Sequence, residues 1–190
     1  MSHQLYVLAA IFTILSTSVN CKVYANAGSR CIDYYKTGEN FDLEKLNGAW
    51  HAVYFWPPIQ RQRDSCAVVN FKKVSSADVS STNKTCHFNI PSDEAIWHST
   101  YTNHAGKFTN VFYYGQEEVK NQIRSCNRFS KYLFIDVNDD YLLGINCSMG
   151  GRGMLLAKQL PTVSQVQAVV NGIDIMSGRD GRPDCQLRSR

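Results

Sequence analysis

Residues 47–58 read NGAWHAVYFWPP. The part from Trp50 to Trp56 is dense in aromatic and other β-favouring residues, which predicts a β-strand. Pro57 and Pro58 end that strand, because proline has no N–H to donate to a neighbouring strand. The glycine and tryptophan at the start of this strand provide a reference point from which the rest of the chain can be divided.

Seven further runs of β-favouring residues follow, separated by clusters of Ser, Asn, Asp, Gly and Pro. These predicted strands are 66–74, 84–90, 95–102, 107–115, 131–137, 141–148 and 152–159. The polar segment 116–128 carries no clear pattern. Residues 138–140, Asn-Asp-Asp, predict a hairpin turn between the sixth and seventh strands.

The pattern changes after Pro161. Val163, Val166, Val169 or Val170, and Ile173 are spaced three or four residues apart, which predicts an amphipathic helix. Eight short strands and one helix favour an all-β fold: an eight-stranded up-and-down antiparallel barrel with one C-terminal α-helix packed outside. Closure removes exposed strand edges, and a barrel of eight strands can hold one small ligand. A two-sheet sandwich would also fit this pattern.

The chain begins with an apolar stretch, Leu5 to Leu15. It is too short to span a membrane, which takes about 20 residues, and it fits the apolar region of a signal peptide. Cleavage could follow Cys21 or Ala25. We therefore expect residues 1–21 (alternatively 1–25) to be removed, and residues 22–190 to form a single secreted domain without a membrane span.

The cysteine count agrees with secretion. The chain has 7 cysteines, and either cleavage removes Cys21 and leaves an even set. Six cysteines in an oxidising compartment predict three disulfides. Because there is no C-x-x-C and no Cys/His cluster, neither a metal site nor a redox motif is expected. The six are Cys31, Cys66, Cys86, Cys126, Cys147 and Cys185.

The formal net charge of +4 is mild, and the basic residues are scattered except near the C-terminus. Arg179, Arg182, Arg188 and Arg190 lie there, partly offset by Asp180 and Asp184. We expect a solvated terminus in preference to a polyanion-binding patch, and no nucleic-acid partner.

Together these features resemble the lipocalin family, most closely the arthropod bilin-binding and apolipoprotein-D-like members. Gly48 and Trp50 match the G-x-W motif, whose tryptophan plugs the closed end of the barrel. Residues 136–141, ending in Tyr141, resemble the second motif, and residues 155–158 lie where the third motif is found. Two positions depart from the family: Val137 stands where an aspartate is usual, and Lys158 replaces an arginine that stacks on the motif tryptophan.

The resemblance also implies a disulfide pattern. Arthropod members tie the N-terminal lead to the seventh strand, which implies Cys31–Cys147. They tie the start of the second strand to the segment after the helix, which implies Cys66–Cys185. The remaining pair is Cys86–Cys126, which in this topology would lie toward the open mouth and brace it.

A barrel pocket needs inward apolar and aromatic side chains, and residues on one strand face recur with period two. Aromatic residues make up 12% of the chain, which favours a flat, unsaturated ligand. The candidate lining residues are Tyr54, Trp56, Trp97, Tyr101, Phe112, Tyr114 and Phe134. Each of them could instead fill the barrel or pack beneath the helix.

Other chemistries have less support. His98 would be the candidate for haem ligation, but Trp97 and His98 cannot both point inward, and a surface histidine is the commoner case. There is no G-x-S-x-G and no H-E-x-x-H, so no enzyme is expected. Of the two glycosylation sequons, Asn83 lies in a turn-like region and is expected to carry sugar, whereas Asn146 precedes a paired cysteine and is expected to stay bare.

The sequence therefore predicts an extracellular carrier, a monomer or weak oligomer, that binds a bilin, retinoid or sterol and requires no cofactor. The alternative is a salivary or haemolymph scavenger that traps a biogenic amine or haem, which polar or charged groups at the pocket floor would favour. A collapsed barrel with a structural or signalling role is the third hypothesis.

Overall fold

The computed structural model describes residues 31–59, 63–86, 90, 96–103, 105–124 and 128–189, except for the side chains at 76 and 86. The expected signal segment, 1–21 or 1–25, lies outside the described residues. Within the described part of the chain, no helix has the length and apolarity needed to cross a membrane.

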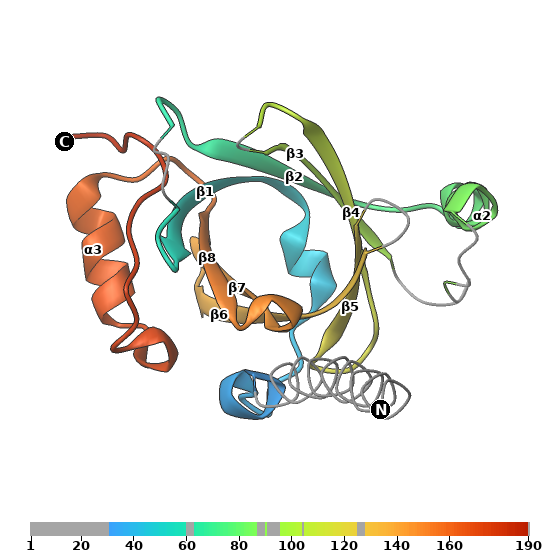
Figure 1. Ribbon diagram of the computed structural model, residues 1–190, viewed down its shortest axis with the longest axis horizontal. Helices are drawn as coiled ribbons and strands as arrows, with labels where there is room; N and C mark the ends of the chain where they lie inside the picture. The colour runs from blue at the N-terminus through green and yellow to red at the C-terminus, as the bar shows by residue number, and fades with distance from the viewer. Residues whose placement is uncertain are drawn as a thin grey trace, which may run out of the picture.

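Eight strands form a closed barrel in which each strand pairs antiparallel with the next and β8 pairs with β1. The strand order follows the chain, so the predicted up-and-down barrel is confirmed and the sandwich is excluded (Figure 1). The strands are β1 (Gly48–Trp56), β2 (Ala67–Lys73), β3 (Trp97–Thr102), β4 (Phe108–Tyr114), β5 (Lys120–Arg124), β6 (Arg128–Asn138), β7 (Tyr141–Asn146) and β8 (Arg152–Ala157).

One predicted strand is wrong and one strand escaped prediction. Residues 84–90 are not the third strand, because the helix α2 (Ser76–Cys86) reaches into them. The missing strand is β5, within the segment that carried no pattern. Its inward-facing side chains are Lys120, Gln122 and Arg124, so the apolar alternation that marks a half-buried strand is absent there.

The up-and-down order gives the barrel two distinct ends. The connections β2–β3, β4–β5 and β6–β7 lie at the end that we call the closed end. The short helix η1 (Leu43–Leu46) also lies there, with both of its leucines buried, and Figure 1 shows it inside the ring of strands. The connections β1–β2, β3–β4, β5–β6 and β7–β8 lie at the other end, which we call the mouth.

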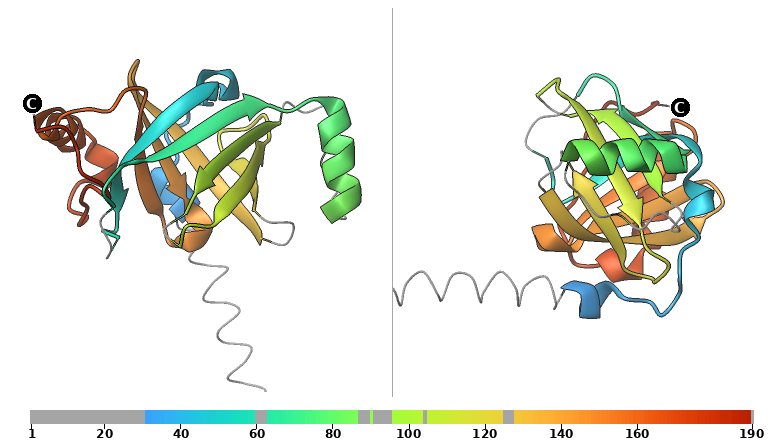
Figure 2. Two further views of the ribbon diagram at one scale, coloured as in Figure 1. Left: turned by 90° about the horizontal axis from the view of Figure 1, so that it is seen from above. Right: turned by 90° about the vertical axis from the view of Figure 1, so that its right-hand side faces the viewer.

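The predicted C-terminal helix is α3 (Val163–Asn171), and it packs outside the barrel. Thr162 and Gln165 form a capping box at its start, so two backbone N–H groups at this end have partners. Val166 is buried and joins a core with Val53 of β1 and Leu155 of β8. Figures 1 and 2 show α3 on one side of the barrel and α2 on the opposite side.

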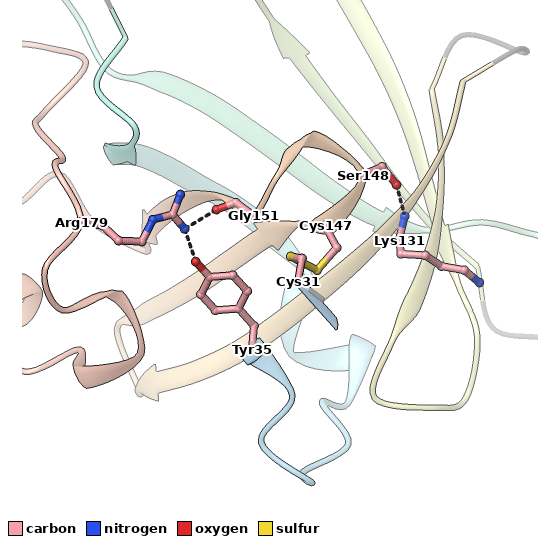
Figure 3. The surroundings of a disulfide bond; sticks show 7 residues. All are labelled: Cys31, Tyr35, Lys131, Cys147, Ser148, Gly151 and Arg179. Carbon is pink, nitrogen blue, oxygen red and sulfur yellow. Dashed lines mark hydrogen bonds between the residues drawn. A yellow bond between two sulfur atoms is a disulfide. The ribbon is translucent and has the colours of Figure 1, made fainter. Parts of the chain in front are cut away.

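Two disulfides tie the terminal segments to the barrel: Cys31–Cys147 and Cys66–Cys185. These are the two pairings that the family resemblance implies. Beside the first bridge, the Arg179 guanidinium donates to the Tyr35 hydroxyl and to the Gly151 carbonyl (Figure 3). Arg182 also donates to the Ile59 carbonyl. These two arginines therefore do not belong to a free solvated tail but hold the C-terminal segment to the fold.

The third pairing, Cys86–Cys126, falls on residues whose side chains are outside the described set, so it stays a prediction. Cys86 is the last residue of α2, and Cys126 lies outside the described residues, so the expected position of this bridge at the mouth also stays a prediction.

Candidate ligand site in the barrel

Three of the seven predicted lining residues face the barrel interior. Trp97 and Phe134 are buried there, and Tyr101 packs partly buried against the same cluster. Trp97, Ser99 and Tyr101 share one face of β3 because strand side chains alternate. Of the three predicted residues, Trp97 and Phe134 lie toward the closed end and Tyr101 toward the mouth.

Tyr54 and Trp56 face outward, so their predicted inward orientation is wrong. Trp50 and Ala52 face the interior, but the pairing of β1 with β8 shifts register between Ala52 and Tyr54. Such a bulge inserts one residue and reverses the face on which later side chains lie. Tyr54 and Trp56 consequently join the outer core, where an added Cβ at Gly181 would lie 2.7 Å from Trp56 Cδ1.

Phe112 and Tyr114 also face outward, and their neighbours on β4 take the inward positions. Both pack against the outer cluster that contains Val79 of α2 and Ile123 of β5. The side chains of this strand alternate between its two faces as predicted, but the sequence alone did not show which face points into the barrel. The inward residues of β4 are Thr109, Val111 and Tyr113.

Trp50 occupies the closed end as the G-x-W resemblance implies. Its indole Nε1 donates to the Leu46 carbonyl of η1 at 2.8 Å. The Lys158 ammonium lies 5.6 Å from the centre of the Trp50 ring, within the range of a cation–π contact. Lys158 therefore supplies the charge over the ring, without the flat stacking of an arginine. Gly48 has φ +109°, which favours glycine at this position.

Aromatic rings fill the closed-end half of the barrel around Phe134. The centre of its ring lies 4.8 Å from that of Tyr132, 5.1 Å from Tyr113 and 5.4 Å from Phe41. These separations are typical of packed aromatic pairs. Phe134 and Trp97 thus belong to a packed floor, so a ligand inside the barrel would have to lie between this floor and the mouth.

Polar side chains that can both donate and accept hydrogen bonds lie among these rings. Gln122 Nε2 donates to the Tyr113 hydroxyl at 3.0 Å, and Asn146 Nδ2 donates to Gln122 Oε1 at 3.0 Å. Burial raises the pKa of Tyr113, so its hydroxyl stays protonated and can still donate. Burial likewise raises the pKa of the Tyr132 hydroxyl.

Two buried polar atoms of the interior have no hydrogen-bond partner among the described residues, the donor Trp97 Nε1 and the acceptor Asn146 Oδ1, whereas the Ser99 hydroxyl lies beside the Tyr113 hydroxyl. Trp97 is 1% exposed and Ser99 0%. A buried donor without a partner costs about 1–3 kcal/mol. An acceptor atom on a bound molecule would remove that cost.

The mouth carries positive charge. The Arg124 guanidinium lies 5.9 Å from the centre of the Tyr101 ring, and Arg63 Nη1 donates to the Thr102 carbonyl at 2.9 Å. Burial raises the pKa of Tyr101, and the two guanidiniums oppose that rise. An open hollow of about 420 Å³ at this rim is lined by residues 63–68 and Thr102.

The acidic side chains that form ion pairs lie away from the barrel interior. Asp136 pairs with Lys45 and Glu44 pairs with Lys73 at the closed end, and Asp184 pairs with Arg63 at 3.5 Å on the outer side. On the described strands, no inward-facing position of the mouth half is Asp or Glu. These strand positions therefore offer no countercharge for a cationic ligand, whereas Asp64 lines the hollow at the rim.

His98 lies on the outer face of β3, so it does not reach a ligand inside the barrel. Its Nε2 is 2.9 Å from Asn110 Oδ1, and its ring stacks on Phe112 with centres 4.6 Å apart. Burial lowers the pKa of His98, so the outward imidazole is neutral at physiological pH. Haem ligation by this residue has no geometric support.

The two sequons differ in ways the sequence did not indicate. Asn83 lies within α2, not in a turn, and its amide both donates to and accepts from the backbone of Ile90 at 3.1 and 3.2 Å. Attaching sugar would break the donating bond. Asn146 faces the interior toward Gln122 and precedes the disulfide-bonded Cys147, in keeping with the expectation that it stays bare.

The class that the fold defines is a closed, eight-stranded, up-and-down barrel with an outer C-terminal helix. No family model and no curated protein matches the chain. Similar solved structures include lobster apocrustacyanin A1, 10% identical over 78% of this chain and 81% of that chain, with a TM-score of 0.46. Apocrustacyanins C1 and C2 are each 10% identical over 87% of both chains, with a TM-score of 0.47.

Proposed function

We propose that this protein is a secreted, lipocalin-type carrier that binds a small, flat, hydrophobic molecule such as a bilin, retinoid or sterol inside the barrel. The barrel topology, the contact between Trp50 and Lys158, and the two disulfides support this class. No catalytic group is required for this function.

The unpartnered Trp97 Nε1 carries the proposal. It is a buried donor inside an aromatic interior. A conjugated ligand with a carbonyl or carboxylate oxygen would pack against the rings and accept a hydrogen bond. Aromatic contacts of this kind contribute about 0.5–1.5 kcal/mol beyond the area they bury.

Gln122 and Asn146 inside the barrel are polar groups of the kind expected for a scavenger, but neither carries the negative charge that would select a biogenic amine. An ammonium group is a donor, and a site selective for it needs an acceptor with negative charge. The described inward positions of the mouth half carry Arg124 and no Asp or Glu, and the unpartnered acceptor there, Asn146 Oδ1, is neutral. The collapsed barrel is the alternative that a binding measurement must exclude.

Titration of the purified protein with a panel of bilins, retinoids, sterols, fatty acids and biogenic amines tests the proposal. Tryptophan fluorescence reports binding, and we expect micromolar or better affinity for conjugated ligands, which corresponds to about 8 kcal/mol. Saturable binding to amines alone would support the scavenger. No binding to any member of the panel would support the collapsed barrel.

Two matched tyrosine variants locate the ligand. Tyr101 faces inward near the mouth, whereas Tyr114 faces outward in the cluster beneath α2. Tyr101→Leu should weaken binding roughly two- to tenfold, in line with the worth of an aromatic contact. Tyr114→Leu should leave the affinity unchanged. Equal effects of both variants would place the ligand outside the barrel.

Secretion is tested by the mass of the mature protein. We expect its N-terminus at Lys22 or Asn26 and no alkylated thiol under denaturing conditions, because removal of Cys21 leaves six cysteines for three bridges. A retained Cys21 or an alkylated thiol would contradict the three-bridge scheme.

A further inference from the structure

The mouth of the barrel places a half-buried arginine directly above the aromatic interior. Gln122 and Arg124 share the inward face of β5, because Ile123 between them packs in the outer cluster. Gln122 reaches the Tyr113 hydroxyl inside the barrel, and the Arg124 guanidinium lies over the Tyr101 ring. The side chain of Arg124 therefore borders the space where a ligand would enter.

No ion pair holds Arg124 within the described part of the chain. Its partner opposite in the sheet register is another arginine, Arg128. Arg152 lies at the same end, on the face of β8 that also presents Met154 and Leu156 inward. Arg124 and Arg128 thus face each other in register, and Arg152 lies on the same inward face two strands away, level with Tyr132; the inward positions of the mouth half carry no Asp or Glu on the described strands.

The charge and the burial of these residues together indicate which chemical groups of a ligand they would bind. A guanidinium over an aromatic ring offers several N–H donors in a plane, which match the two oxygens of a carboxylate. The floor of rings below favours an apolar body. The buried donor Trp97 Nε1 adds no positive charge and also requires an acceptor atom.

We propose, on the basis of the carrier function above, that the physiological ligand is an amphipathic carboxylate whose apolar part lies in the barrel and whose anionic head binds Arg124 at the mouth. Arg128 and Arg152 raise the local positive potential and favour entry of the anion. A neutral alcohol of the same shape would leave Arg124 without a partner.

Paired ligands that differ only in the head group test this inference: all-trans retinoic acid and all-trans retinol, titrated into the full secreted protein. We expect retinoic acid to bind at least tenfold more tightly than retinol. Arg124→Gln should remove that preference by weakening retinoic acid about tenfold while retinol binding changes less than twofold. Arg124→Lys should restore only part of it, because lysine keeps the charge but lacks the planar donors.

Arg188→Gln is the matched control, since this exposed arginine near the C-terminus is remote from the barrel strands in sequence and changes the net charge equally. It should leave both affinities unchanged. Equal binding of acid and alcohol to the unaltered protein would overturn the carboxylate inference and leave the carrier function standing. If Arg124→Gln weakens the binding of both ligands equally, Arg124 has a structural role instead. If the unaltered protein binds neither ligand, the result counts against the carrier function itself.

Discussion

The two halves of this barrel differ in what fills them. In the closed-end half, rings pack on rings: Phe134 lies against Tyr132, Tyr113 and Phe41, and Trp50 seals the end against Leu46. In the mouth half, the inward side chains include Arg124, Thr109 and Tyr101. The difference suggests that the closed end maintains the fold while the mouth is available for recognition. Variants of each half should then change different properties.

Trp50→Ala should have the largest effect on stability. It removes a buried ring, a hydrogen bond to Leu46 and the contact with Lys158, and truncation of a large core aromatic costs about 3–5 kcal/mol. The midpoint of denaturant unfolding measures this loss. A near-neutral result would mean that the G-x-W match is accidental and that the closed end does not stabilise the barrel.

Removal of one disulfide should have the next largest effect. The double variant Cys66→Ser, Cys185→Ser opens a bridge between residues 119 positions apart and should cost about 2–4 kcal/mol. Ligand affinity should change little, because both cysteines belong to the outer core and not to the barrel interior. If the variant is fully folded and still loses much of its affinity, the bridge contributes to the binding site.

Gly144→Ala tests the packing of the closed-end half directly. An added Cβ at this position would lie 2.9 Å from Cε1 of Tyr132, closer than real contacts allow. Overpacking of this kind costs about 1–3 kcal/mol. The control is Ala168→Ser on the exposed face of α3, which should leave stability nearly unchanged. Gly178→Ala does not serve as a control, because the positive φ of Gly178 would strain an alanine there. Equal stability of both variants would contradict tight packing around Tyr132.

Lys158→Arg should have the smallest effect. An arginine would keep the charge over Trp50 and add planar stacking, so unfolding should become harder by at most about 1 kcal/mol. Lys158→Met, which removes the charge and keeps the length, should move the midpoint the other way. A destabilising Lys158→Arg would show that the closed end is shaped for the lysine.

Particular residues explain which parts of the two halves could be predicted from the sequence. Trp50 and α3 were predictable because each rests on a local pattern, a motif tryptophan in one case and a helical spacing of valines in the other. The strand β5 was not, since Lys120, Gln122 and Arg124 face inward and hide the usual alternation. A polar segment between two strong strands was the signal that could have suggested it.

The site was harder to predict than the fold. The sequence correctly grouped Tyr54 with Trp56, and Phe112 with Tyr114, as residues sharing a face. It could not show that a bulge after Ala52 reverses the face of β1. The prediction also missed inward residues such as Tyr113 and Gln122. They follow from the alternation of side chains once the inward face of each strand is known.

Amide hydrogen exchange with and without bound retinoic acid shows whether the ligand occupies the mouth half above the packed floor. We expect slower exchange at the mouth ends of the strands, at 99–102 of β3, 108–111 of β4 and 122–124 of β5, with little change around Trp50 and Leu46. Protection confined to the outer face beneath α3, or to the closed end, would contradict this placement of the ligand.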